Sequence, residues 1–312
     1  MELTTAKFSG HQSFPFRNTW LTKGVLGCAK RPSIFKGDDA LVVFGVGKNM
    51  VDSIKYWCLA TRVLERDPEV KNNRGYFLRP TPLGNRLFIE HGGWDRYLED
   101  EGTLWLLHWL LATNPKWATT AYFAFNEMTG LEFTRAGLER AVFRLAAKMP
   151  KVRASENTIR RDVSVFIRTY LSALHHRGRS VEDSLDCPLT ELGLIYEEPT
   201  RRVYSFLRGP KDSLPDAVVL YAVWDYSRQR SGQRSFTFDE LAYQPLSPGR
   251  VFKLDEPALA ERLERLSGLT AGAWQLTETA GYRQLLMTDG IDPMQVLTDY
   301  YERRAGDTFH ES

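Results

Sequence analysis

The sequence predicts a mainly α protein with small β wings, built from tandem winged helix-turn-helix-like modules. Apolar residues recur at spacings of three and four along several segments, as they do in amphipathic helices. A short helix, a glycine-rich turn, a longer helix and a hairpin follow one another in residues 38–80, which is the element order of a winged helix-turn-helix. A similar order returns near the C-terminus, without a detectable sequence repeat.

The first module, residues 1–95, contains the predicted recognition helix. We expect a short apolar helix over residues 38–44 and, after a glycine turn, a longer helix over residues 48–64. A hairpin with a polar tip at residues 66–75 follows, and Pro82 then opens another helix, because proline fits the first helical turn. The face of the longer helix that we expect to be buried consists of Val51, Ile54, Trp57 and Cys58.

The middle module, residues 96–210, begins with an aromatic helix over residues 103–112. A strongly amphipathic helix is expected over residues 155–170, with Ser155 as its N-cap, because a serine oxygen can accept a hydrogen bond from a free N–H of the first turn. Its buried stripe is expected to consist of Ile159, Val163, Phe166, Ile167 and Tyr170.

The third module, residues 211–312, has an order of elements similar to that of the first. Asp255 is expected to cap a helix that has Pro257 in its first turn. The expected elements are helices at residues 216–227, 237–243 and 256–266, a loop at 247–253, a strand at 274–277, and residues 279–281 leading into a last helix.

Charge is distributed unevenly along the chain, although the net charge is only +2. Residues 1–210 contain 30 basic and 23 acidic residues, whereas residues 211–312 contain 11 basic and 16 acidic residues. Basic residues are most concentrated at 144–179, where nine stand against two acidic residues. A polyanion partner for the first two modules is one interpretation, and a solvated basic face without a partner is the other.

Composition excludes several classes of protein. With 43% hydrophobic and 26% charged residues among 312, the chain can build cores and is not a disordered tail. No apolar run approaches the ~20 residues that span a bilayer, and we expect a cytoplasmic protein without a membrane partner. The three cysteines are widely spaced, which argues against a zinc site or a disulfide scaffold. Walker-type, Rossmann and metal-carboxylate signatures are missing, so no cofactor is evident.

The predicted recognition helix has the side chains that base readout requires. Asparagine can pair with adenine and lysine can reach guanine or phosphate, while an ordinary exposed helix face is the alternative. A second candidate is the helix over residues 155–170, and a third is the 247–253 loop, whose glycine and two cations could hold a phosphate. The residues expected to contact double-stranded DNA are Arg17, Lys48, Asn49, Ser53, Lys55, Arg74, Arg79, Asn157, Arg160, Arg161, Arg250 and Lys253.

His11 is the one candidate for catalysis that the sequence offers, and it is a weak one. With Ser13 and Arg17 nearby, an imidazole could perform acid–base chemistry on a phosphodiester. A lone histidine beside several phenylalanines is more often structural, and that interpretation is favoured.

Four stretches resemble a bacterial family described only as a domain of unknown function. They are FSGHQSFPFR at residues 8–17, GVGKNMVDSIKYW at 45–57, SENTIRRDVSVFIRTY at 155–170 and SPGRVFKLDE at 247–256. Members of that family occur with DNA phosphorothioation and phage-defence genes, and one member, from the Ssp system, is described as a DNA-nicking protein. The resemblance implies partners in that pathway, namely a cysteine desulfurase, a sulfur-transfer enzyme and an ATPase.

The function expected from the residues and the resemblance together is that of a DNA-binding component of a phosphorothioation system. The protein could also nick DNA to allow sulfur incorporation, with Mg²⁺ as cofactor, and it could form a homodimer; the sequence leaves both questions open. Two alternatives remain: a winged-helix transcription regulator without catalysis, and an adaptor that assembles the modification complex.

Overall fold

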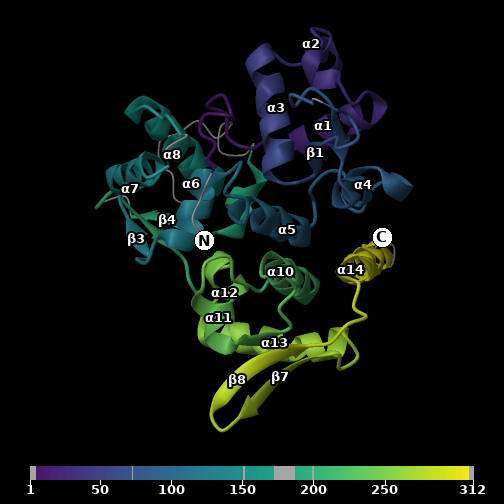
Figure 1. Cartoon of the computed structure of the whole chain (residues 1–312), viewed down its shortest axis with the longest axis vertical. Helices are drawn as coiled ribbons and strands as arrows, with labels where there is room; N and C mark the ends of the chain where they lie inside the picture. Colours follow the sequence, from purple (N-terminus) through teal and green to yellow (C-terminus); the bar gives the residue numbers. More distant parts are fainter. Residues whose placement is uncertain (1–4, 72, 150–151, 172–186, 199, 309–312) are drawn as a thin grey trace. The chain divides into compact units, whose positions relative to one another are not determined.

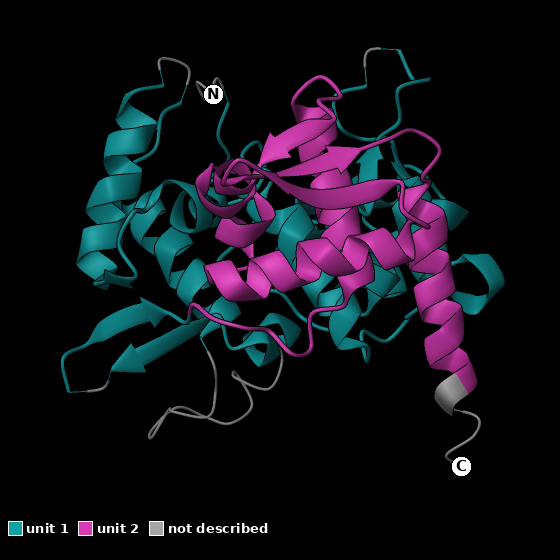
Figure 2. Ribbon diagram, turned by 90° about the horizontal axis from the view of Figure 1, so that it is seen from below, with its two compact units in different colours: residues 1–207 teal, residues 208–312 magenta. Residues whose placement is uncertain are grey.

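The structure, a computed structural model, describes residues 5–71, 73–149, 152–171, 187–198 and 200–308. The chain is mainly helical with small antiparallel sheets, which confirms the first part of the predicted fold class (Figure 1). It divides into two compact units, residues 1–207 and 208–312 (Figure 2). The division between units falls within a few residues of the change in composition near residue 210. A separate boundary at 95/96 stays a prediction.

The first unit begins with three α-helices, two strands and a fourth α-helix, with two short 3-10 helices among them, and the α-helix at residues 20–30 was not predicted. As predicted, a short helix, a turn and a longer helix precede a hairpin. The longer helix α3 ends at Ala60, four residues earlier than expected, because Arg62 takes the left-handed conformation (φ 57°) and the Thr61 hydroxyl bonds to the Trp57 carbonyl. The elements are α1 (Trp20–Lys30), η1 (Ile34–Lys36), α2 (Ala40–Phe44), α3 (Lys48–Ala60), β1 (Leu64–Arg66), β2 (Leu78–Pro80), α4 (Pro82–Phe88) and η2 (Glu90–Gly92).

The β1–β2 hairpin is an antiparallel pair in the register Leu64↔Pro80 to Arg66↔Leu78. Asn73 organises its long tip. The Asn73 side-chain oxygen accepts hydrogen bonds from the backbone N–H groups of residues 75–77, and its amide donates to the carbonyls of Asp67 and Phe77. This side chain therefore fixes the shape of a tip that carries several cations.

The rest of the first unit surrounds α5, which is buried along almost its whole length because it is apolar on all sides. His108 of α5 lies 3.0 Å from the Tyr170 hydroxyl, beside the Phe125 ring. The elements are α5 (Glu101–Ala112), α6 (Thr119–Tyr122), the π-helical turn η3 (Phe123–Glu127), β3 (Glu132–Phe133), α7 (Arg135–Ala147), α8 (Glu156–Tyr170), η5 (Pro188–Leu192), β4 (Ile195–Glu198) and β5 (Val203–Phe206).

Helix α8 confirms the predicted amphipathic pattern. The Ser155 side chain accepts a hydrogen bond from the Thr158 N–H, as an N-cap should. All five residues of the expected stripe are buried. Helix α7, which packs against α8, was not predicted, and the three strands of this region form an antiparallel sheet in the order β3-β5-β4.

The second unit confirms three predicted helices and corrects two segments. Residues 248–251, expected as loop, form the short helix α12, which packs against α11; a Cβ on Gly249 would lie 2.8 Å from the Ala242 Cα. Residues 279–281 do not lead into a helix. Ala280 and Gly281 both have positive φ and turn β7 back into a further strand. The elements are α10 (Asp216–Gln229), β6 (Ser235–Thr237), α11 (Phe238–Tyr243), α12 (Pro248–Val251), α13 (Glu256–Leu269), β7 (Trp274–Thr279), β8 (Tyr282–Met287) and α14 (Pro293–Thr308).

Both three-stranded sheets have the same topology. In the first unit the order is β3-β5-β4 and in the second it is β6-β8-β7, so that in each the last strand lies between the other two. Along the chain, the first strand of each sheet is short, helices follow it, and the other two strands then form a hairpin. The shared topology relates the middle and third predicted modules, whereas the sequence predicted a similarity between the first and the third, and the first has only the two-stranded β1–β2 pair. The assignment as winged helices stays a prediction. No helix in the described ranges has the length and apolar character needed to cross a membrane.

Candidate nucleic-acid interface

Helix α3 presents one polar face, as its sequence predicts. Gly45, in the left-handed conformation at φ 65°, ends α2, and Gly47 is the N-cap of α3. The apolar face expected from the spacing is buried against α1 and its surroundings (Figure 1). Lys48, Asn49 and Asp52 are exposed at the N-terminal end of the helix.

One residue of the expected contact set on α3 lies inside the protein. Ser53 is 0% exposed, and its hydroxyl donates a hydrogen bond to the carbonyl oxygen of His11 at 3.0 Å. Tyr56 is also buried under the N-terminal segment, where a Cβ on Gly10 would lie only 2.4 Å from the tyrosine ring. The segment carrying the FSGHQ motif thus covers this side of α3, and Ser53 cannot reach DNA without rearrangement.

The remaining surface of α3 leads into a cavity of about 410 Å³. Its walls come from the N-terminal segment, α3, the β1–β2 hairpin and Trp117, two residues before α6. We call this cavity the basic groove. Its charged and aromatic lining residues are Lys7, Phe8, Asp52, Lys55, Tyr56, Arg66, Arg74 and Trp117. Four cations and one carboxylate give the groove a positive field, which favours an anionic ligand.

Lys55 is held at the floor of the groove. Its Nζ donates a hydrogen bond of 2.6 Å to the carbonyl oxygen of Gly75, which ties α3 to the hairpin tip. Burial lowers the pKa of Lys55, and the nearby Arg66 and Lys7 lower it further, although Asp52 opposes them. Because these surroundings disfavour the charged form of Lys55, an anion bound beside it would stabilise that form.

A second cavity of about 460 Å³ adjoins the basic groove, because Leu59, Arg66 and Trp117 line both. It adds Arg62 and Lys116 to the lining, together with the carboxylate of Glu65, which pairs with Arg79. The sequence interpretation missed the cations at positions 7, 62, 66 and 116 because nothing in their spacing links them. The one available signal was the basic character of the hairpin tip.

The other cations expected to contact DNA from the first module differ in their exposure and in their contacts within the protein. Arg74 is exposed and lines the groove. Arg79 instead pairs across the hairpin with Glu65 at 2.8 Å, and Arg17 lies over the rings of Phe14 and Trp20. Arg17 and Arg79 therefore have contacts within the protein that DNA would have to replace.

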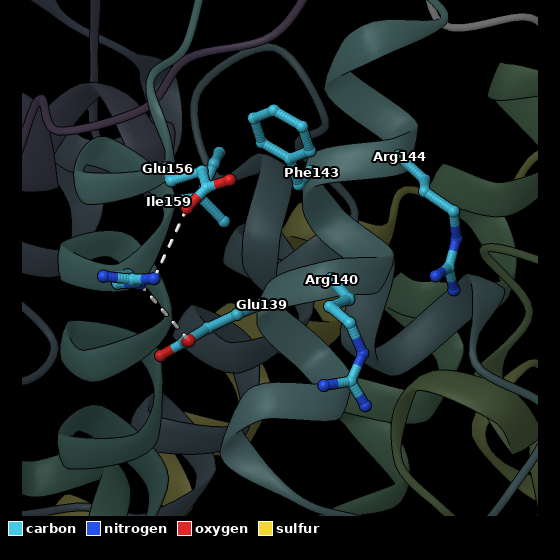
Figure 3. Close-up of a pocket in the computed structure, with 7 residues that line it drawn as sticks. Glu139, Arg140, Phe143, Arg144, Glu156 and Ile159 are labelled. Carbon is cyan, nitrogen blue, oxygen red and sulfur yellow. Dashed lines mark hydrogen bonds and ion pairs between the residues drawn. The ribbon is translucent and has the colours of Figure 1, made fainter.

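The α7–α8 surface contains a further cavity of about 300 Å³ (Figure 3). Arg160 lies between Glu156 at 3.4 Å and Glu139 at 4.0 Å, so its charge is already compensated. Figure 3 shows Arg140 and Arg144 extending together from α7, on the side away from these carboxylates. Asn157 and Arg161, from the expected set, are exposed on α8.

His11 is held at both ring nitrogens. Its Nδ1 accepts a hydrogen bond from the Ser13 N–H at 3.1 Å, and its Nε2 lies 2.8 Å from an oxygen of Asp162. Asp162 also accepts from the Ser9 N–H at 2.7 Å and from the Thr120 hydroxyl at 2.6 Å. Both His11 and Asp162 are buried. These contacts favour the structural interpretation, because neither nitrogen faces a substrate.

The phosphate loop expected in the third module has a different form. Lys253 is buried, and burial, together with Arg250 and Arg208, lowers its pKa to about 7. Arg250 is half-buried and donates to the Tyr243 carbonyl at 3.4 Å. Lys253 is therefore not available to a phosphate at the surface, since only 7% of the residue is exposed.

Acidic and other metal-binding side chains do not gather in the part of the chain that the structure describes. No three His, Cys, Asp or Glu residues there lie together as metal ligands. Asp52 is the one carboxylate that lines the basic groove.

These features define a class: a mainly helical protein with a basic groove beside the second helix of a helix–turn–helix–hairpin arrangement. The chain belongs to the family described as "Protein of unknown function (DUF4007)", which it matches over residues 8–301. No curated protein matches it. The family predicted from residues 8–17 and 45–57 is thereby confirmed.

Two solved structures are similar to this chain along most of its length. One, described as "SspB crystal structure", is 33% identical, covers 96% of this chain and 89% of its own, and has a TM-score of 0.85. The other, "Magnesium ion-bound SspB crystal structure", is 34% identical, covers 95% and 88%, and has a TM-score of 0.84.

Proposed function

We propose that this protein is a DNA-binding component of a bacterial DNA phosphorothioation and phage-defence system. The likeness to SspB over nearly the whole chain supports the pathway, given what the family resemblance implies. A single observation carries the DNA-binding part: Asp52, on the exposed face of α3, also lines the basic groove together with Lys55. Such a surface suits DNA, because the helix face can contact base edges while the cations of the groove contact backbone phosphates.

The spacing on α3 explains this arrangement. Lys48, Asp52 and Lys55 follow one another at intervals of four and three, so they share one side of the helix. Lys48 and Asn49 are exposed at the N-terminal end, which is the part of a recognition helix that reaches base edges. Arg66 and Arg74 on the hairpin would then lie against phosphates. In this proposal the first module acts as a winged helix.

The second unit has a different proposed role. Its excess of acidic residues disfavours phosphate contact, and α13 carries Glu256, Glu261 and Glu264. We assign it to contacts with other proteins of the pathway, for which the resemblance implies a desulfurase, a sulfur-transfer enzyme and an ATPase. A homodimer and a cytoplasmic location belong to the same proposal.

Alanine at Lys48 and Asn49 tests the DNA-binding function. We expect Lys48→Ala to weaken binding to all duplexes alike and to lower the slope of log affinity against log salt by about one. Asn49→Ala should instead cost about 1–3 kcal/mol on the preferred sequence and relax the preference at one base pair. Anisotropy titrations over a salt series, with a randomised duplex pool, measure both effects. Wild-type protein that binds no duplex even at low salt would refute the proposal.

Nicking is proposed as an activity of the same groove. Mg²⁺ is usually held by one or two carboxylates together with substrate phosphates, and Asp52 is placed to supply the carboxylate. Bound metal would stabilise charge at the phosphodiester. We expect Asp52→Asn to abolish Mg²⁺-dependent relaxation of supercoiled plasmid, while DNA affinity rises because a negative charge leaves the groove.

The matched control for nicking is Asp38→Asn, which removes an exposed carboxylate before α2. It should leave plasmid relaxation as in the wild type. Equal nicking by wild type and Asp52→Asn would exclude Asp52 as the metal-binding carboxylate. If wild-type protein leaves the plasmid supercoiled with every divalent metal, the protein binds DNA without nicking it.

A further inference from the structure

The lining of the basic groove includes aromatic side chains, among them Phe8 and Trp117, which phosphate binding alone does not require. Trp117 is partly exposed and lines the cavity together with Lys7, Lys55, Arg66 and Arg74. Cations beside an accessible aromatic ring match both parts of a nucleotide. We propose that the basic groove receives one unpaired nucleotide of a DNA strand, with its phosphate among the cations and its base against Trp117. This inference rests on the proposed DNA-binding function.

The four cations come from three separate segments, and all face one cavity. Lys7 lies in the N-terminal segment, Lys55 on α3, and Arg66 and Arg74 on the β1–β2 hairpin. Arg66 lies along Gly75, where a Cβ would stand 3.4 Å from its Nε, and Lys55 holds the carbonyl oxygen of the same glycine. The hairpin tip and α3 are therefore fixed relative to each other, so the phosphate site is largely formed before the ligand arrives.

The wall formed by Trp117 is tied to the N-terminal segment. The Lys7 N–H donates a hydrogen bond of 2.9 Å to the Thr119 hydroxyl, and the Lys7 ammonium lies 5.6 Å from the centre of the Trp117 ring. A cation over an exposed ring is a weak contact. A stacked base gains more from the same ring, so it can displace the lysine, whose charge then serves the phosphate.

The size of the cavity suits a single nucleotide. At about 410 Å³ it falls within the range of small-ligand sites, and a double helix cannot enter a space of that volume. A base inside a duplex is stacked on both faces and cannot lie on Trp117. The nucleotide must therefore be out of the stack, which costs least where the strand is already unpaired.

The test compares two short duplexes of one sequence, fully paired or carrying one unpaired thymine, in anisotropy titrations with the full chain. We expect wild-type protein to bind the duplex with the unpaired thymine about tenfold more tightly, the size of effect that stacking one base on an aromatic ring supports. Trp117→Ala should bring the ratio of the two affinities close to one, and Trp117→Phe, which keeps a ring, should retain part of it.

Two further variants make the result specific. Lys48→Ala, on the α3 face outside the groove, should weaken binding to both duplexes and keep their ratio. Tyr97→Ala removes an aromatic ring that is 64% exposed and lies outside the groove, and it should change neither affinity. Equal wild-type affinities for the two duplexes, or a ratio unchanged in Trp117→Ala, would overturn the inference alone. Loss of binding to both duplexes by the wild type would overturn the proposed function and the inference with it.

Discussion

Replacing Asp162 by alanine is expected to lower the free energy of unfolding of the first unit by about 3–5 kcal/mol, the cost of removing one partner from a buried polar pair. Asp162 accepts from the Ser9 N–H, from His11 and from the Thr120 hydroxyl, and it is 5% exposed. Alanine would leave the His11 ring and the Thr120 hydroxyl buried without this partner, and the partly buried Ser9 N–H without an acceptor. Each unsatisfied buried donor costs about 1–3 kcal/mol, which is consistent with the total.

The effect should extend beyond α8, because Asp162 joins three parts of the chain. It connects α8 to the N-terminal segment through Ser9 and His11, and to α6 through Thr120. That segment in turn covers α3, where Ser53 bonds to the His11 carbonyl. We therefore expect His11→Ala to destabilise the same unit, and the two substitutions together to cost less than their sum, since they remove one shared contact.

Urea unfolding followed by tryptophan fluorescence measures the change. Asp162→Asn keeps the size and one carbonyl oxygen, so it should cost less than alanine. Asp38→Ala, at an exposed position, should stay within about 0.5 kcal/mol of the wild type. A loss below about 1 kcal/mol for Asp162→Ala, the size of one ordinary hydrogen bond, would show that the network does not hold the segment in place.

Replacing both Arg66 and Arg74 by alanine should cause a large loss of DNA affinity, because these two exposed arginines line the basic groove. Each is expected to neutralise one phosphate, so the slope of log affinity against log salt should fall by about two. At physiological salt we expect a loss of roughly tenfold to thirtyfold, from release of the counterions that those two phosphates hold. The loss should be similar for unrelated duplex sequences, because phosphate contacts carry no base information.

Arg228→Ala together with Arg234→Ala is the matched control. These two arginines are exposed in the acidic second unit, so the same net charge is removed far from the groove in sequence. If this control reduces affinity and the salt slope as much as the groove variant does, binding depends on net charge and the groove has no special part. If Arg66→Ala with Arg74→Ala leaves the slope unchanged, DNA does not lie along the hairpin.

Local sequence patterns predicted α2, α3, α4, α5, α8, α10, α11 and α13, with ends up to four residues off, but did not predict α1, α6, α7 or α12. The buried stripe of α8, its Ser155 cap and the Asp255 cap of α13 all have the predicted form, since spacing and capping depend on residues a few positions apart. The turn between β7 and β8 was missed because Ala280, rather than asparagine or glycine, takes a positive φ there. Helix α12 was missed because four residues are too few to show a period.

The functional surface depends on contacts that no local pattern contains. The sequence by itself determined a mainly helical family member in which Lys48 and Asn49 stand exposed at the start of α3. Only the tertiary structure decided that the N-terminal segment buries Ser53, that Lys253 lies inside the second unit, and that Lys7, Arg66 and Trp117 meet at one groove. Helix periodicity gives the side of a helix on which a residue lies. Whether that side meets water depends on which distant segment packs there.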